Sequence, residues 1–492
     1  MQRANWSGVP ERFVLAIDQG TSSTKVIAVA VDGSVLARGS ASLDLSTPQP
    51  GWVEQSPQGV LESVRAAIAD LGSQVDLSAA VCIGISNQRE SLVLWERKTG
   101  LPVSPVISWQ DRRTTALVDE LAWAGDEVRA ISGLPLDPMF SALKARWLLD
   151  AHDPTRARSD AGELVLGTVD AWLLHGLTGE IGIESGNASR TSLVDLATGD
   201  WSPRLLEIFG IPRAALPTIR DSVGILGEVR GFAPLPDGVP VSGVLGDSHA
   251  ALFSHAGWRP GVAKATYGTG SSVMALSAAP ADSDTGLCRT IAWRLPGEGP
   301  ALAWEANILA AGATLAWLAG ILGSTPAELA DEASASAEGV VMIPAFNGLA
   351  APWWDTEAQA LLSGLSLSTG RAQLARAALD SIVFQVCDVI AAMRDARCLP
   401  MRLIADGGIS ANAEVMRRQS ALCDLTVAVS PVAEASALGA AHAAGLGIGF
   451  WDLAALESLS REYREYHESI SPETRSELLH DWHQALALAQ SR

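Results

Sequence analysis

The order of apolar and polar positions divides the chain into short apolar runs and longer segments with helical spacing. Residues 57–71 and 371–394 carry apolar side chains every three or four positions, which predicts amphipathic helices. The runs that predict buried strands are residues 13–17, 25–31, 35–40, 80–86, 241–245, 263–267, 403–405 and 427–429. Strands that alternate with helices in this way indicate an α/β fold in which helices are layered on sheets.

One strand–turn–strand pattern occurs twice along the chain. The turn after residues 13–17 is rich in Gly, Thr and Ser, and so is the turn after residues 263–267. A repeated supersecondary unit predicts two related halves, which should divide near residues 247–257. The expected domains are residues 11–253 and 254–450, followed by a helical tail at 451–492.

Composition narrows the class of protein. The 492 residues carry a net charge of −20, so nonspecific attraction to nucleic acid or to an anionic membrane is not expected. The five cysteines are scattered and form no C-x-x-C pair, which argues against a disulfide framework and a structural zinc site. Residues 435–456 are apolar but interrupted by His, Gly and Asp, so we expect a buried helix and a cytoplasmic protein.

The turn after the first strand has the composition of a phosphate-binding loop. Asp18 ends the apolar run, Gly20 allows a tight turn, and hydroxyl side chains follow from Thr21 onward. Backbone N–H groups and hydroxyls of such a turn can surround phosphate oxygens, and Lys25 adds a positive charge. Asp18 is placed to hold Mg²⁺, usually through water. The alternative is an ordinary β-hairpin with a Ser/Thr-rich turn.

Two further glycine turns follow strands, at residues 268–271 and 406–408. Two phosphate-binding hairpins that face each other, with a third turn for the nucleoside, would form a nucleotide clamp. The alternative is that each turn uses glycine only for its freedom to adopt positive φ.

Asp247 is the candidate general base, because it ends a strand shortly before the second hairpin. An alcohol that attacks a phosphoryl group needs a carboxylate to accept its proton. Asp247 can equally be a helix N-cap. His249 lies two positions away, and we expect it to be either a bystander of Asp247 or a residue that acts on the site only through its neighbours.

Arg89 and Glu90 place a donor and an acceptor side by side at a strand end. A polyhydroxyl ligand needs both kinds of hydrogen bond, and Trp109 could line the same pocket. The alternatives are a surface ion pair for Arg89 and Glu90 and an ordinary core position for Trp109.

These motifs together resemble the FGGY carbohydrate kinases, and within that family the glycerol kinases most closely. The resemblance covers residues 17 to about 451. The segments that carry it are Ile17-Asp18-Gln19-Gly20-Thr21, Ser86-Asn87-Gln88-Arg89-Glu90-Ser91, Trp109-Gln110, Arg112-Arg113-Thr114, Gly167-Thr168-Val169-Asp170, Asn187-Ala188-Ser189-Arg190-Thr191, Gly246-Asp247, Thr266-Tyr267-Gly268-Thr269-Gly270 and Asp406-Gly407-Gly408, together with residues 139–150 and 360–380.

The resemblance implies an actin-like α/β fold of two ribonuclease-H-like domains with the active site in the cleft between them. It implies transfer of the ATP γ-phosphate to a primary hydroxyl of a polyol or sugar, with Asp247 as the base and Asp18 serving Mg²⁺. The residues implied to bind phosphates or nucleotide are Thr21, Ser22, Lys25, Thr269, Gly312, Gly408 and Asn412. The residues implied to contact the polyol are Arg89, Glu90 and Trp109.

Three pocket positions depart from the glycerol-kinase pattern. Met139 stands where a Tyr is usual, Ser272 where an aromatic is usual, and Ser248 where a Gln is usual; Lys25 replaces an Arg. These changes should reshape the pocket. Glycerol is the expected substrate, because Asn-Gln-Arg-Glu is the glycerol-kinase form of that motif, and a tetritol, pentitol or ketose such as xylulose is the alternative.

Two other classes remain open. An actin-like nucleotide-dependent assembly protein would share the hairpins but would not need Arg89, Glu90, Trp109 and Asp247 together. A sugar sensor would bind a polyol without phosphorylating it. The family often forms dimers or tetramers, so a homodimer or homotetramer is an open expectation.

Overall fold

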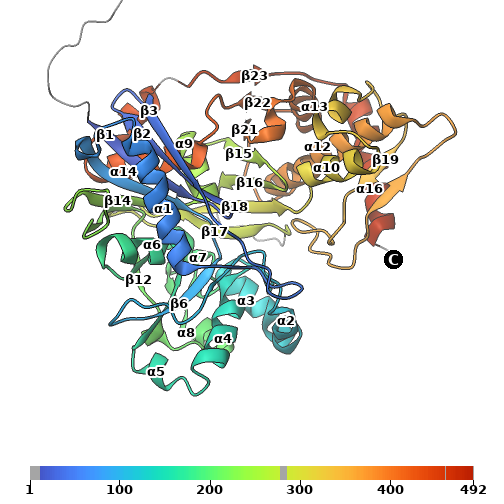
Figure 1. Cartoon of the computed structure of the whole chain (residues 1–492). Coiled ribbons are helices and arrows are strands. Elements are labelled where there is room, and N and C mark those ends of the chain that lie inside the picture. Colours follow the sequence, from blue (N-terminus) through green and yellow to red (C-terminus); the bar gives the residue numbers. More distant parts are fainter. Residues whose placement is uncertain (1–11, 278–284, 460, 491–492) are drawn as a thin grey trace, which may run out of the picture. The chain divides into compact units, whose positions relative to one another are not determined.

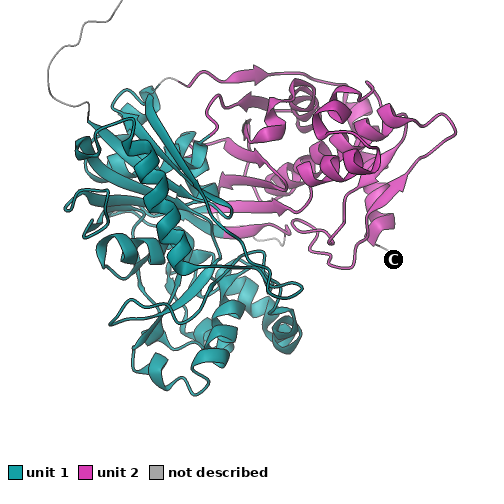
Figure 2. Ribbon diagram, viewed as in Figure 1, with its two compact units in different colours: residues 1–256, 290–302, 434–460 teal, residues 257–289, 303–433, 461–492 magenta. Residues whose placement is uncertain are grey.

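The computed structural model describes residues 12–277, 285–459 and 461–490. The chain divides into two compact units, coloured separately in Figure 2. Unit 1 contains residues 1–256, 290–302 and 434–460, and unit 2 contains residues 257–289, 303–433 and 461–492. Unit 1 therefore includes a segment from late in the chain. From the sequence, residues 434–450 of this segment are expected in the C-terminal domain.

The central sheet of unit 1 has the strand order β13-β14-β5-β1-β2-β3. The hairpin of β1 (Phe13–Gln19), β2 (Ser23–Ala30) and β3 (Val35–Ser42) is antiparallel. β5 (Ala80–Asn87) and β14 (Pro240–Gly246) then add in parallel on the other side of β1, and β13 (Val223–Glu228) closes that edge. The carboxyl ends of β1, β5 and β14 consequently lie at one edge of the sheet.

Helices cover both faces of this sheet (Figure 1). α1 (Pro57–Gly72) begins with an N-cap at Ser56 and proline in its first turn, as the sequence predicts. α14 (Ala435–Gly447) packs so closely on the opposite face that a Cβ at Gly84 would lie 2.1 Å from the Ala440 carbonyl oxygen. Glycine at this position is therefore required by the approach of helix to strand.

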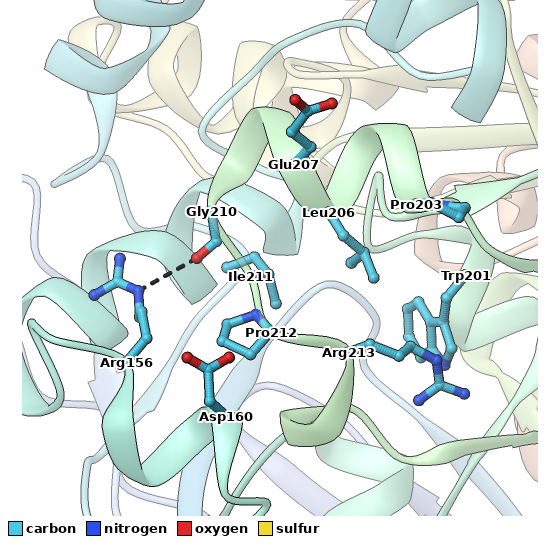
Figure 3. Close-up of a pocket in the computed structure, with 10 residues that line it drawn as sticks. All are labelled: Arg156, Asp160, Trp201, Pro203, Leu206, Glu207, Gly210, Ile211, Pro212 and Arg213. Carbon is cyan, nitrogen blue, oxygen red and sulfur yellow. Dashed lines mark hydrogen bonds between the residues drawn. The ribbon is translucent and has the colours of Figure 1, made fainter.

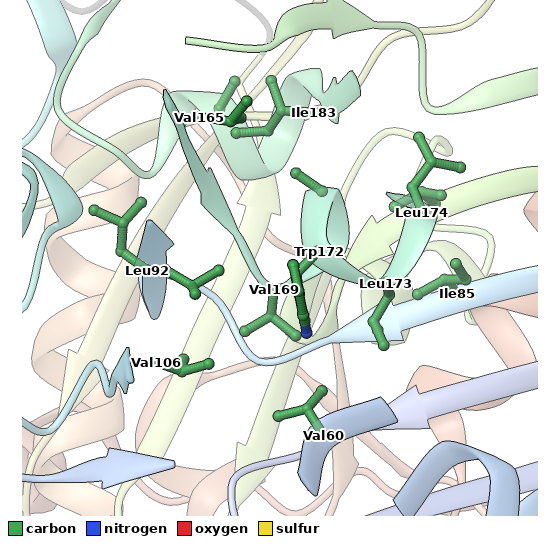
Figure 4. Close-up of a cluster of buried hydrophobic side chains, with 14 of the residues drawn as sticks. Val60, Ile85, Leu92, Val106, Val165, Val169, Trp172, Leu173, Leu174 and Ile183 are labelled. Atoms are coloured by element: carbon green, nitrogen blue, oxygen red, sulfur yellow. The ribbon is translucent and has the colours of Figure 1, made fainter. Parts of the chain in front are cut away.

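A second sheet, β4-β7-β6-β8, continues the core of unit 1. β6 (Leu92–Glu96) pairs antiparallel with β7 (Val106–Ile107) and β8 (Leu164–Thr168), and β4 (Glu54–Gln55) pairs with β7. Apolar side chains from this sheet, from α1, β5 and α6 (Val169–Thr178) form one buried cluster. Figure 4 shows part of it, including Val60, Leu92, Val165, Trp172 and Ile183.

The sheet of unit 2 has the order β17-β18-β16-β15-β21-β22-β23. β15 (Val262–Tyr267), β16 (Ser271–Leu276) and β18 (Ala301–Ile308) are antiparallel, and β21 (Arg402–Asp406) and β22 (Thr426–Val429) run parallel to β15. This arrangement repeats that of β3, β2, β1, β5 and β14 in unit 1. The repeated topology confirms the two related halves expected from the sequence.

Unit 2 buries its own apolar core around α12 (Arg371–Asp395). α10 (Gly312–Ile321), α13 (Ala413–Cys423) and α16 (Pro472–Gln490) contribute to the same cluster. The C-terminal tail, which the sequence predicts to be helical and whose many charged residues indicate a surface position, is different in the structure: β23 (Arg464–Tyr466) pairs with β22, and Trp482 of α16 is fully buried. The Trp482 indole Nε1 donates to Asp388 Oδ2 at 2.7 Å, so the tail is part of the core.

The remaining elements of unit 1 are short and connect the two sheets. The sequence predicts a helix near Asp111, but α2 (Thr115–Leu121) begins later because the Asp111 carboxylate accepts from Arg113 and from the Val53 N–H. The other bounds are α3 (Gly125–Ser132), α4 (Ser141–His152), α5 (Ala157–Asp160), β9 (Gly182–Glu184), α7 (Ser185–Ser189), β10 (Val194–Asp195), β11 (Asp200–Trp201), α8 (Pro203–Phe209), β12 (Thr218–Arg220), α9 (Asp247–Ser254) and α15 (Leu453–Ser458). Unit 2 adds α11 (Pro326–Asp331), β19 (Val341–Ile343) and β20 (Leu361–Ser363); β17 is Cys288–Trp293.

Candidate functional site

The turn between β1 and β2 presents the residues expected to bind phosphate. The Gly20 N–H donates to the Ser23 carbonyl at 3.0 Å, which closes the turn. Ser22 and Lys25 are exposed there and Thr21 is half-buried. Trp109 donates its indole Nε1 to Thr21 Oγ1 at 3.0 Å, so the structure brings Trp109 to the turn between β1 and β2 and not to the core.

Asp18 lies beside this turn, at the carboxyl end of β1. Ser86 on the neighbouring strand β5 donates its hydroxyl to Asp18 Oδ1 at 2.9 Å. Burial raises the pKa of Asp18 to about 6. The Ser86 hydrogen bond lowers this pKa, the negative charges of Asp247 and Glu434 raise it, and Lys25 lowers it. The Asp18 carboxylate therefore has more negative than positive charge around it.

Arg89 and Glu90 form a tight turn after β5. The Ser91 N–H donates to the Arg89 carbonyl at 2.7 Å, and Glu90 has φ of 60°. Positive φ is costly for a residue other than glycine and persists where its surroundings hold it. Ser141 contributes by donating its hydroxyl to the Glu90 carbonyl at 2.9 Å. Arg89 is 6% exposed and Glu90 5%, so the pair is not a surface ion pair.

Arg190 binds the Glu90 carboxylate, a role that could not be predicted from the sequence. Its Nε lies 2.6 Å from Glu90 Oε1, and the Arg190 side chain is fully buried. The guanidinium also lies over the Phe140 ring, 5.1 Å from the ring centre. The Asn187-Ala188-Ser189-Arg190-Thr191 motif marks this segment as a candidate part of the site. It does not reveal the partner of Arg190, because Glu90 lies 100 residues away in the chain.

Lys144 of α4 fixes the segment that carries Met139. Its Nζ donates to the Pro138 carbonyl at 2.8 Å, to the Phe140 carbonyl at 3.4 Å and to the Met139 carbonyl. Burial lowers the pKa of Lys144 to about 7, because the charged form loses hydration. Met139 itself is buried.

Asp247 is the first residue of α9, after the Gly246 N-cap, so the alternative role as N-cap does not apply. Its Oδ1 accepts from the Ser248 N–H at 2.6 Å and lies 3.1 Å from Arg89 Nε in an ion pair. The Asp247 side chain is 45% exposed whereas Arg89 is buried. An accessible carboxylate oriented by a guanidinium is suited to accept a proton from a bound alcohol.

A buried polar network lies behind these residues. Glu184 caps α7 by accepting from the N–H groups of Gly186 at 2.6 Å and Asn187 at 2.8 Å. The side-chain amides of Asn187 and Asn87 pair across the two segments at 2.9 Å. Burial raises the pKa of Glu184 to about 7 and that of Asp170, whose Oδ2 accepts from the Glu184 N–H, to about 6. The network links the end of β5 to the segment that carries Arg190.

Unit 2 presents backbone groups at the corresponding edge of its sheet. The Gly312 N–H donates to the Gly268 carbonyl at 3.0 Å, and the Ala313 N–H donates to the Thr269 carbonyl at 3.0 Å. The start of α10 is therefore docked on the turn between β15 and β16. A Cβ at Gly312 would lie 2.7 Å from the Gly268 carbonyl oxygen, which leaves room only for glycine.

The third glycine turn meets the second one. Thr266 pairs with Asp406 across β15 and β21, so the turns after these strands are neighbours. Gly407 has φ of 87°, and a Cβ there would lie 2.4 Å from the Tyr267 carbonyl oxygen. Gly408 is exposed, with open space around its Cα.

Asn412 and Ser272 complete the expected residues of unit 2. The Asn412 side chain caps α13 by accepting from the N–H groups of Glu414 at 3.0 Å and Val415 at 3.1 Å, which occupies its Oδ1. Ser272 lies on β16 opposite Thr266 and is half-buried. The structure thus groups Thr269, Gly312 and Gly408 closely, and places Ser272 on the adjoining strand.

A hollow of about 560 Å³ lies elsewhere on unit 1 (Figure 3). Trp201, Ile211 and Pro212 line it, together with two arginines and two acidic residues. Arg156 is tied to the Gly210 carbonyl at 3.3 Å. None of the expected site residues lines this hollow.

In the part of the chain that the structure describes, no helix is long and apolar enough to cross a membrane. Within the same residues, no group of three or more His, Cys, Asp or Glu side chains forms a ready metal cage.

Comparison with known proteins identifies the family. The N-terminal domain of the FGGY family of carbohydrate kinases matches residues 13–254, and its C-terminal domain matches residues 263–448. The chain belongs to this family. FGGY membership agrees with the grouping of Arg89, Glu90 and Asp247 beside a phosphate-type turn in unit 1.

Among curated FGGY relatives, glycerol kinase of Aromatoleum aromaticum is 42% identical over 97% of this chain and 99% of its own length. Glycerol kinase of Methylorubrum extorquens is also 42% identical, over 96% and 97% of the two chains. The solved structure of Plasmodium falciparum glycerol kinase with ADP is 29% identical, covers 98% of this chain and 99% of that one, and has a TM-score of 0.92. These likenesses confirm the two-domain carbohydrate-kinase fold expected from the sequence.

Proposed function

We propose that this carbohydrate kinase transfers the γ-phosphate of ATP to a primary hydroxyl of glycerol and so forms glycerol 3-phosphate. The observation that supports this most is the buried turn in which Arg89 lies against Asp247 while Glu90 is held by Arg190. It presents a donor, an acceptor and a base within one small region. The glycerol kinases to which the chain is similar give the substrate.

The proposed reaction uses these groups as follows. Arg89 donates hydrogen bonds to hydroxyl oxygens of the polyol, and Glu90 accepts one from a neighbouring hydroxyl. Asp247 accepts the proton of the reacting hydroxyl, whose oxygen forms a bond to the γ-phosphorus as the bond to the ADP oxygen breaks. The Asp247 carboxylic acid then loses this proton to solvent.

Nucleotide binding is assigned to both units. Thr21, Ser22 and Lys25 of unit 1 would contact phosphate oxygens. The edge of unit 2 with Thr269, Gly312 and Gly408 would hold the nucleotide through its close approach to the backbone, with Asn412 capping the helix that follows the last turn. Glycine at these turns lets a ligand come near the backbone.

The surroundings of Asp18 fit a divalent cation. Its pKa is raised by burial and by the charges of Asp247 and Glu434, so a cation would relieve carboxylate repulsion there. Mg²⁺ needs only one or two protein carboxylates, because water and phosphate oxygens complete its shell. Bound with the nucleotide, Mg²⁺ would neutralise phosphate charge; Asp18 would hold it.

The proposed substrate is tested by a coupled assay of ADP release with Mg-ATP. The panel contains glycerol, erythritol, the common pentitols, xylulose, ribulose and gluconate. Rapid turnover with glycerol supports the proposal. Turnover only with a longer substrate would contradict glycerol and would show that Met139 and Ser272 have reshaped the pocket.

The role of Asp247 is tested by Asp247→Asn. General-base catalysis contributes about 10²–10⁴-fold in rate, so kcat should fall by at least that range. ATP binding, measured by calorimetry, should stay within a few-fold of the wild type. Normal turnover by this variant would contradict the assignment of Asp247 as the base.

A further inference from the structure

His249 lies against the same arginine that orients Asp247. It is the third residue of α9 and is fully buried. Its Nε2 lies 3.3 Å from Arg89 Nη1, while Arg89 Nε lies 3.1 Å from Asp247 Oδ1. One guanidinium therefore contacts two residues of the same first helical turn.

The chemistry of this contact defines the state of the histidine. A guanidinium carries only N–H donors, so the ring nitrogen that faces it must accept. Nε2 is then without a proton, and the neutral imidazole carries its proton on Nδ1. A protonated imidazole would instead place a second cation 3.3 Å from Arg89, in a buried site where charge repulsion is strong.

We propose that His249 is a positioning residue for polyol binding, which in its neutral form holds Arg89 in the orientation that meets Asp247. Protonation of the imidazole ends this contact and so weakens polyol binding at acid pH. The inference rests on the proposed role of Arg89 as a polyol ligand. It adds a residue that reaches the substrate only through Arg89.

The close packing around His249 supports a fixed contact. A Cβ at Gly246 would lie 2.4 Å from Arg89 Cδ and 3.2 Å from His249 Nδ1. A Cβ at Gly186 of α7 would lie 2.9 Å from His249 Nδ1. Glycine at both positions leaves the space that the imidazole and the stem of Arg89 occupy.

Several charged groups around His249 bear on its protonation. Arg89 on the β5 side and burial of the ring both oppose a positive charge. Across Gly186, the Glu184 carboxylate favours one, since the same Cβ position lies 3.0 Å from Glu184 Oε2. Asp247 on α9 also favours it but is already paired with Arg89. On α14, which packs on α9, His442 lies edge-to-face with Trp451, with the ring centres 5.7 Å apart.

The experiment compares the wild-type enzyme with His249→Leu and His249→Gln. Leu fills space without an acceptor, so the KM for glycerol at pH 8 should rise about tenfold or more, as expected for loss of a hydrogen bond to a charged group. The KM for ATP should stay within about twofold, because the contact serves only the polyol side. Gln restores a neutral acceptor and should recover most of the loss.

The pH profile separates positioning from a merely structural role. Between pH 8 and pH 5.5 the wild-type KM for glycerol should rise more steeply than that of His249→Gln, whose amide does not titrate. His255→Gln, at the other end of α9, is the matched control and should follow the wild type. Superimposable profiles of the wild type and His249→Gln, or an unchanged KM in His249→Leu, would overturn the proposal.

A variant that does not fold and a wild-type enzyme that rejects glycerol each require a further comparison. If His249→Leu does not fold, as judged by thermal unfolding, the comparison of His249→Gln with the wild type decides alone. If the wild-type enzyme rejects glycerol but phosphorylates another polyol, the same comparison is made with that polyol; this result contradicts only the proposed substrate. If the wild-type enzyme phosphorylates none of the polyols, both proposals are overturned.

Discussion

The two units prepare their sites in different ways. In unit 1 the site consists of side chains that depend on partners far away in the chain: Glu90 on Arg190, and Arg89 on Asp247 and His249. In unit 2 it consists of backbone turns whose glycines permit close approach, as at Gly312 and Gly407. A small polyol requires directed hydrogen bonds, whereas glycine turns let a nucleotide come close to the backbone, so the difference matches the two proposed ligands.

If unit 1 depends on buried charge pairs, Arg190→Met should have the largest effect on stability. Removal of one partner leaves the Glu90 carboxylate buried without its cation, which costs about 3–5 kcal/mol. The free energy of unfolding, measured with urea, gives this loss, and the KM for glycerol should rise with it. Arg204→Met, which breaks the exposed pair with Glu127 at 2.8 Å, is the control and should change little. Equal losses in the two variants would remove the distinction between buried and exposed pairs.

The buried network behind the unit 1 site predicts a pH effect of intermediate size. The pKa of Glu184 in the folded protein is raised from 4.5 to about 7, so the folded state binds more protons than the unfolded state between these values. The contribution of Glu184 to the free energy of unfolding is therefore complete below about pH 4.5. It falls as the pH rises to 7, by up to about 3 kcal/mol. Glu184→Gln should lose less stability over this range in urea unfolding at pH 5 and pH 8.

A carboxyl with the opposite shift provides the control for this measurement. Arg204 lowers the pKa of exposed Glu127, so its contribution is lost as pH falls, and Glu127→Gln should alter the pH dependence in the opposite direction. A wild-type curve parallel to that of Glu184→Gln would mean that Glu184 does not titrate in this range.

The smallest expected effect tests the backbone character of the unit 2 site. Gly312→Ala should destabilise by about 1–3 kcal/mol, because its Cβ would overlap the Gly268 carbonyl. It should also raise the KM for ATP while the KM for glycerol is retained. Gly320→Ala on the same helix meets no atom within 4 Å and should stabilise by up to about 1 kcal/mol. If both variants behave alike, the packing of α10 on the turn is not what requires glycine.

The same difference explains what the sequence could and could not predict. Strands, hairpins and glycine turns are encoded by neighbouring residues, so β1, β2, β15 and β21 and their turns are found where the sequence predicts them. The partners of Arg89 and Glu90 could not be predicted, since Arg190 and His249 become neighbours only through the fold. For His249 the sequence leaves both a bystander and a supporting role open, because spacing alone does not show what faces it.

Domain boundaries that depend on long-range packing could not be predicted from the sequence either. The apolar segment of α14 shows that it is buried but not where, and the structure packs it on β5 of unit 1. The tail likewise shows a helical pattern, while the burial of Trp482 depends on Asp388 of α12.

The return of α14 to unit 1 has a consequence for synthesis on the ribosome. β1 leaves the exit tunnel first, but the helix that covers one face of its sheet is made more than 400 residues later, and Trp451 then donates to the Val31 carbonyl at 2.8 Å. Until then the nascent first unit carries an apolar sheet face without its cover. Fragments that stop after residue 256 should therefore bind chaperones or aggregate, and the first unit should mature only after α14 has been made.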